Sequence, residues 1–113
     1  METPASSFTI RSKIWIADGS GSVVFGLGRY RILEAVREAG SLNAAAKLLK
    51  MSYRAVWMRV RTSEARIGRP LVIRQGKGSC LTPFAEALMT QFADLLRSVQ
   101  RESDRVYQNL NWD

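Results

Sequence analysis

The segment GSLNAAAKLLKMSYRAVW, residues 40–57, predicts two helices joined by a short turn. Ser41 is a favourable N-cap for a short helix over residues 42–49, which is rich in the strong helix formers alanine and leucine. After a two-residue turn, Ser52 is placed to cap a longer helix from position 53 to about position 67. The spacing of two adjacent capped helices therefore sets the plan of the chain.

The sequence on either side adds strands and two further helices. Alternating apolar residues over 8–16 and a short apolar run over 23–25 predict a hairpin. A helix over about 29–39 is stopped by Gly40, and Thr82 followed by proline starts a long last helix. The predicted elements are an N-terminal hairpin over 8–25, three helices over 29–67, a second hairpin over 71–82 and a long helix over 83–110.

The order β-β-α-α-α-β-β-α indicates a mainly α (α+β) fold of the winged helix-turn-helix class, in a single domain over residues 1–113. The second hairpin is the wing. The predicted helix over 53–67 contains no glycine or proline and is basic, so a helix of this kind can enter a DNA major groove.

Composition excludes several classes of function. The 113 residues include no histidine and one cysteine, Cys80, so neither an intramolecular disulfide nor a Cys/His metal cage can form. Histidine acid–base catalysis is excluded as well, and we expect neither an enzyme nor a cofactor. No signal peptide and no apolar run long enough to cross a bilayer is evident, which predicts a cytoplasmic protein.

The net charge of +7 is concentrated in the middle of the chain. Residues 47–77 contain nine lysines and arginines against Glu64 alone, whereas the segments before and after are close to neutral. Like charges crowded on one surface repel one another unless a polyanion neutralises them. The distribution therefore favours a nucleic acid as partner, ahead of an anionic membrane.

One face of the predicted helix over 53–67 carries the main candidates for DNA contact. Arg54 and Arg61 can donate to base edges or to phosphates, since an arginine can grip guanine bidentately. Tyr53 and Trp57 share that face and could contact a phosphate or a thymine methyl group. Trp57 could equally pack against a neighbouring helix, and the sequence leaves these two interpretations open.

Further candidates lie at the start of helices and in the wing. Ser41 and Asn43 begin the short helix and could hold a phosphate, as could Ser52, although capping alone explains both serines. Arg74 and Lys77 flank the glycine turn of the wing, where they could approach phosphates or a minor groove.

Two other arginines of the same helix, Arg59 and Arg66, face away from the candidate stripe. They could reach backbone phosphates or remain solvated, and the sequence does not separate these alternatives.

The long last helix predicts a dimer. Its second half is longer than a domain of this size can cover, which would leave Val106, Tyr107, Leu110 and Trp112 exposed. A two-fold contact would bury that face and would suit a two-fold operator. The predicted interface residues are Phe84, Leu88, Phe92, Leu95, Val99 and Val106.

The chain resembles the DNA-binding domain of the ModE family of molybdate-responsive transcription regulators. The resemblance rests on the Gly-Ser-Leu-x-Ala-Ala-Ala stretch over 40–46, the Ser-Tyr-Arg-Ala-Val-Trp run over 52–57 and Leu-Thr ahead of the long helix. It extends from about Phe8 to Val106, and LysR-type regulators share its alanine-rich helix. The resemblance implies a winged-helix transcription regulator that binds double-stranded DNA as a homodimer through the long helix.

Members of the ModE family carry oxyanion-binding domains after the long helix, and nothing in this sequence resembles that module. We therefore expect a sequence-specific DNA-binding regulator without its own oxyanion sensor and without an evident small-molecule effector. The main alternative is a winged-helix module that binds another protein through its long helix. A third class, an enzyme, is disfavoured because no paired carboxylates or phosphate loop accompany a nucleophile.

Overall fold

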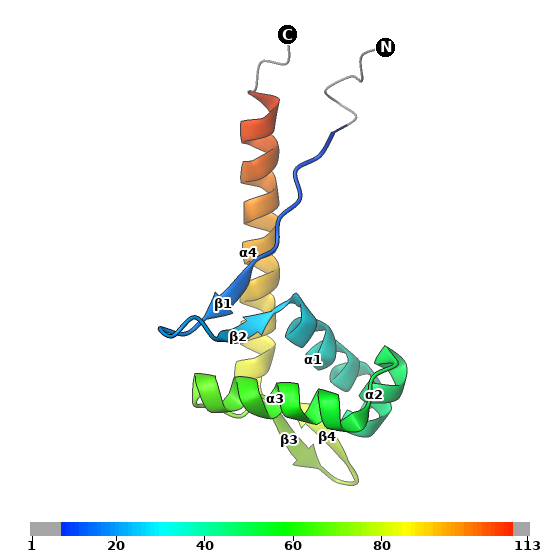
Figure 1. The fold of residues 1–113 in the computed structure, drawn as a ribbon. Coiled ribbons are helices and arrows are strands. Elements are labelled where there is room, and N and C mark those ends of the chain that lie inside the picture. The colour runs from blue at the N-terminus through cyan, green and yellow to red at the C-terminus, as the bar shows by residue number, and fades with distance from the viewer. Residues whose placement is uncertain (1–7, 110–113) are drawn as a thin grey trace. The chain divides into compact units, whose positions relative to one another are not determined.

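The computed structural model describes residues 8–109 (Figure 1). The elements, in chain order, are β1 (Trp15–Ala17), β2 (Val23–Gly26), α1 (Leu27–Ala39), α2 (Leu42–Leu49), α3 (Tyr53–Ile67), β3 (Val72–Gln75), β4 (Gly78–Leu81) and α4 (Pro83–Gln108). This is the predicted winged helix-turn-helix order. Leu110 and Trp112, predicted to be exposed on the last helix, lie outside the described residues.

The chain forms two compact units. One is Ile14–Met89, which contains both hairpins, the first three helices and the beginning of α4. The other, within the described residues, comprises residues 8–13 and 90–109. The candidate DNA-binding residues all belong to the first unit.

The predicted helix caps are confirmed in detail. The hydroxyl oxygens of Ser41 and Ser52 accept hydrogen bonds from the backbone N–H groups of Ala44 and Ala55, each at 3.0 Å. Gly40 and Gly68 end α1 and α3 in left-handed conformations, with φ angles of 83° and 82°. These local signals fix the lengths of the helices around the turn.

The predicted first strand over 8–16 is wrong in its length. β1 covers only Trp15–Ala17, paired antiparallel with β2 from Gly26 to Val23. A strand needs a partner along its whole length, and β2 gives way at Gly26 to α1, which begins at Leu27 rather than near position 29. Residues before Trp15 therefore have no neighbouring strand in β2, despite their alternating pattern.

The core of the larger unit comes from the inner faces of α1, α2 and α3 together with β2 and β3. Val56, Val60 and Ser63 form a stripe along α3 that is fully buried. It is buried with residues from the other elements, namely Phe25, Ile32, Leu33, Val36, Ala45, Ala46, Leu71 and Val72. The opposite face of α3 is thereby free to carry polar and aromatic side chains.

The wing, β3–β4, is attached to the helices by one carboxylate. The Oε2 atom of Glu64, on α3, accepts hydrogen bonds from the backbone N–H groups of Leu71 at 2.7 Å and Val72 at 3.1 Å. Its Oε1 atom binds the guanidinium of Arg61 at 2.6 Å. The same side chain therefore positions the wing and an arginine of α3.

A close backbone approach provides a second attachment. The N–H of Ser79 in β4 donates to the carbonyl of Gly40 between α1 and α2, at 2.8 Å. A Cβ atom added to Gly78 would lie 2.2 Å from that carbonyl oxygen. Only glycine at position 78 permits the wing to lie this close to the turn.

We predict that Gly78→Ala lowers the free energy of unfolding by about 1–3 kcal/mol, because the new methyl group must displace the wing from Gly40. Gly28→Ala is the matched control, since a Cβ there meets nothing within 4 Å. That variant should change stability by less than about 1 kcal/mol. Equal midpoints in urea unfolding for both variants would contradict the close contact.

Glu64→Ala should lower the free energy of unfolding by about 2–4 kcal/mol, because it leaves two backbone N–H groups and Arg61 without their acceptor. Glu102→Ala, which removes an exposed ion pair with Arg105, is the control and should cost about 0–1 kcal/mol. Urea unfolding of both variants measures the difference, and a Glu64→Ala loss no larger than that of the control would refute the anchoring role.

Candidate nucleic-acid interface

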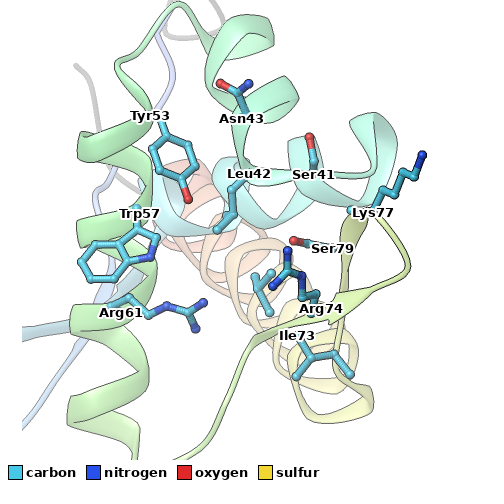
Figure 2. Close-up of a pocket in the computed structure, with 12 residues that line it drawn as sticks. Ser41, Leu42, Asn43, Tyr53, Trp57, Arg61, Ile73, Arg74, Lys77 and Ser79 are labelled. Carbon is cyan, nitrogen blue, oxygen red and sulfur yellow. The ribbon is translucent and has the colours of Figure 1, made fainter.

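Three elements converge on a groove of about 370 Å³ (Figure 2). The start of α2, one face of α3 and the wing each contribute to its lining. The lining residues are Ser41, Leu42, Asn43, Tyr53, Trp57, Arg61, Val72, Ile73, Arg74, Lys77, Gly78 and Ser79. Of the nine DNA-contact candidates from the sequence, all but Ser52 and Arg54 line this groove.

The α3 side of the groove is a row of three side chains one turn apart. Tyr53, Trp57 and Arg61 follow one another at i, i+4 and i+8, so they lie on one face of the helix. The indole of Trp57 is 41% exposed, and the guanidinium carbon of Arg61 lies 5.9 Å from the centre of its ring. Trp57 is thus a surface residue beside an arginine rather than a core residue.

Arg54 lies beside this row rather than in the groove. Together with Tyr53, Trp57 and Met58 it lines a second hollow of about 390 Å³ on the outer surface of α3. Met58 is half exposed and was not identified from the sequence, although it lies one turn after Arg54. The exposed side of α3 therefore combines two arginines with aromatic and thioether groups.

The starts of α2 and α3 differ in their relation to the groove. Ser41 and Asn43 line it, with the Ser41 hydroxyl oxygen already engaged as the cap of α2. Ser52 caps α3 in the same way but does not line the groove. Neither helix has an acidic residue in its first turn, so the positive end of each helix dipole is not offset there.

The wing side of the groove supplies two cations and an exposed apolar residue. In Figure 2 the guanidinium groups of Arg61 and Arg74 extend into the space between α3 and the wing, whereas Lys77 points outward from the wing tip. Ile73 and Ser79 complete this side and were not predicted from the sequence. The pairing register accounts for Ser79, which it places opposite Arg74 on the same face of the hairpin.

Charge in the groove is of one sign. Arg61, Arg74 and Lys77 are its charged lining residues, and no carboxylate is among them. The nearest acid on α3 is Glu64, whose oxygens are occupied by Arg61 and by the wing backbone. A concave surface lined by cations and by no carboxylate is chemically suited to a polyanion.

The long helix α4 places the predicted interface residues in different environments. In the larger unit, Phe84 and Leu88 are half buried, and the guanidinium carbon of Arg69 lies 4.7 Å from the Phe84 ring centre. In the smaller unit, Phe92 is only 1% exposed, while Leu95 and Val106 are open to solvent.

The smaller unit contains an apolar groove of about 410 Å³. Ile10, Val99, Val106 and Tyr107 provide its apolar lining, beside Glu102 and Ser103. The amide of Gln100 donates to the carbonyl of Ile10 at 3.1 Å, which fastens the N-terminal segment to this part of α4.

Residues 8–109 contain neither a metal-ligand cluster nor a membrane-spanning helix. No group of three or more histidine, cysteine, aspartate or glutamate side chains is arranged to hold a metal ion in that range. Within the same range no helix is both long and apolar enough to cross a membrane.

Sequence comparison places the chain among known regulators. It is 35% identical over 88 residues to the molybdenum transport protein ModE of Azotobacter vinelandii, covering 74% of this chain and 33% of that protein. It is also 35% identical over 86 residues to the transcriptional regulator ModE of Haemophilus influenzae, covering 72% of this chain and 33% of the relative. The chain thus spans about a third of the length of these curated relatives, and the resemblance to ModE is confirmed.

Structural comparison gives the same result. The chain matches the DNA-binding domain of CbnR in a crystal structure with DNA, with a TM-score of 0.56 and 30% sequence identity, over 70% of this chain and 91% of that one. Residues 27–86, from the beginning of α1 into α4, match the family of bacterial regulatory helix-turn-helix proteins of lysR type. The chain therefore belongs to the lysR family of bacterial regulatory helix-turn-helix proteins.

Proposed function

We propose that this chain binds double-stranded DNA in a sequence-specific manner, as the DNA-reading part of a ModE-like transcription regulator. The observation that carries the proposal is the groove in which the start of α2, the exposed face of α3 and the wing meet, with three cations and no carboxylate among the lining residues. The match to CbnR, whose domain is described in complex with DNA, supports the same conclusion.

Base recognition comes from α3 in the major groove. A helix with its side chains is about 10–12 Å wide and the major groove about 12 Å, so α3 fits there lengthwise. Arg54 and Arg61 donate to guanine edges or phosphates, and the exposed rings of Tyr53 and Trp57 contact thymine methyl groups or sugar. The cation–π contact between Arg61 and Trp57 restricts both side chains before DNA arrives.

Backbone contacts come from the two sides of the groove. Asn43 and the capped start of α2 bind a phosphate, with the unoffset helix dipole favouring the anion. Arg74 and Lys77 on the wing bind a phosphate or enter a minor groove. Because Glu64 ties the wing to α3, these contacts have a fixed spacing relative to the base-reading row.

The functional unit in this proposal is a homodimer formed through the later part of α4. Val99 and Val106 line an apolar groove with Ile10, and the ion pair between Glu102 and Arg105 lies along the same stretch of helix. A second copy of the helix buries this apolar strip and leaves the charged groups at its rim. Two reading helices then face two half-sites of a two-fold operator.

Replacing Arg54 and Arg61 together by alanine should weaken binding to a duplex selected from a random pool by about 2–5 kcal/mol, because two charge-assisted contacts are lost. Binding of the unaltered protein should fall by orders of magnitude between about 50 and 200 mM salt. Fluorescence anisotropy at several salt concentrations gives both results. Salt-independent binding, or an unaffected double variant, would refute the proposal.

Val106→Asp should convert the dimer into a monomer. Val106 is 50% exposed in the single chain. In the dimer, an aspartate at this position would place an unpaired carboxylate inside the contact between the two α4 helices. Gln108→Asp is the control, since its position is exposed and about half a turn away around α4. Sedimentation velocity measures the change. Identical sedimentation of both variants, or a monomeric unaltered protein, would contradict a dimer through this strip.

A further inference from the structure

A second row of basic side chains lies along α3, on the flank away from the groove. Arg59 and Arg66 are seven residues apart, so they lie on the same side of the helix, two turns from each other. At about 100° per residue this row is about half a turn from the row of Tyr53, Trp57 and Arg61. Between the two rows, the outward face carries Arg54, Met58 and Ala65, which are all exposed.

A third arginine, from α1, joins this second row. The Nε–H of Arg29 donates to the hydroxyl oxygen of Ser63 at 3.2 Å, and Ser63 lies between Arg59 and Arg66 on α3. Burial, and then the positive charges of Arg59 and Arg66, lower the pKa of Arg29. The guanidinium of Arg29 is therefore close enough to Arg59 and to Arg66 to be repelled by both, beside the buried Ser63.

The positions of these arginines are set by neutral acceptors. Arg66 donates to the carbonyl oxygen of Val23 on β2, and Arg59 donates to the carbonyl of Ala55 at 3.4 Å. None of the ion pairs found over residues 8–109 includes any of the three arginines. Neutral acceptors orient the guanidinium groups without neutralising their charge.

One carboxylate, that of Asp18, offsets part of the charge of this row. Asp18 interacts electrostatically with Arg66, but its carboxylate also accepts hydrogen bonds from the backbone N–H groups of Ser20 and Ser22, each at 3.0 Å. The first turn of α1, which carries Arg29, has no acidic residue. Three cations against one carboxylate leave a net positive surface that a polyanion would stabilise.

We propose that Arg29, Arg59 and Arg66 form a second phosphate-binding surface, which holds the backbone of one DNA strand while Arg74 and Lys77 of the wing hold the other. The inference rests on the proposed entry of α3 into a major groove. Because a helix nearly fills that groove, both of its flanks meet the phosphate walls. Cations on one flank alone would leave the second wall without a contact.

Phosphate contacts carry no sequence information, so this surface adds affinity equally on every sequence. Base discrimination remains with the outward face and with Arg61. Experiment can therefore separate the two rows. Substitutions in the row of Arg59 and Arg66 should change the affinity and its salt dependence. Substitutions in the row that contains Arg61 should change sequence specificity as well.

The test compares Arg59→Ala with Arg66→Ala, made together, against the unaltered protein. The dissociation constant is measured over a series of salt concentrations, on a duplex selected from a random pool and on a random-sequence duplex of the same length. The slope of log K against log salt should become shallower by about 2, because each phosphate contact contributes about 0.9. At about 150 mM salt the affinity for both duplexes should fall by the same factor, tenfold or more.

The matched control is Arg97→Ala with Arg101→Ala on α4, which removes the same charge from side chains bonded to Asp94 and Ser98. Its salt slope should equal that of the unaltered protein. A lysine version, Arg59→Lys with Arg66→Lys, should restore the slope because the charge rather than the bond to Val23 carries the effect. Thermal unfolding of every variant accompanies the titrations.

Three results would overturn the inference. An unchanged slope in the alanine variant, with binding still lost on removing Arg54 and Arg61, rejects the second surface and leaves the proposed function standing. An equal loss in the α4 control, or a lysine version as weak as the alanine variant, also rejects it. If the unaltered protein binds neither duplex, the proposed function itself fails.

Discussion

The arrangement of the candidate DNA-binding surface depends on one carboxylate. Glu64 accepts hydrogen bonds from the backbone N–H groups of Leu71 and Val72, at the start of the wing, through one oxygen and binds the guanidinium of Arg61 through the other. It is the single acidic residue in the basic segment 47–77. Without it, the wing and α3 would each retain their own hydrogen bonds but lose the contact that sets their relative position, and with it the width of the groove.

The second constraint is the absence of a side chain. Gly78 allows the wing to approach the carbonyl of Gly40 so closely that β4 donates a hydrogen bond to the turn between α1 and α2. Glu64 and Gly78 thus hold the wing at two points, against α3 and against the start of α2. The cations of the groove are consequently presented on a fixed frame, which lowers the entropy lost when a polyanion binds.

The sequence was most informative where the determinants are local. Serine caps, left-handed glycines and helical periodicity depend on a few neighbouring residues, and they predicted the helices around Ser52 closely. The length of β1 depends on where its partner strand ends, which alternation over 8–16 does not encode. Trp57 lies at the edge of the buried stripe on a helical wheel, so the sequence could not decide whether its side chain is exposed. The acceptor role of Glu64 likewise depends on the path of the chain after α3. A lone acid among nine basic residues is nevertheless a sequence signal that points to a structural role for Glu64.

The central claim is that DNA lies against the face of α3 that carries Trp57. The indole N–H resonances of the tryptophans, observed by nitrogen–proton correlation NMR, report this directly when a selected duplex is added. The account predicts a large shift or broadening for Trp57 and a smaller change for Trp15, which is exposed on β1 and does not line the groove. A duplex that binds tightly while leaving the Trp57 resonance in place would contradict it.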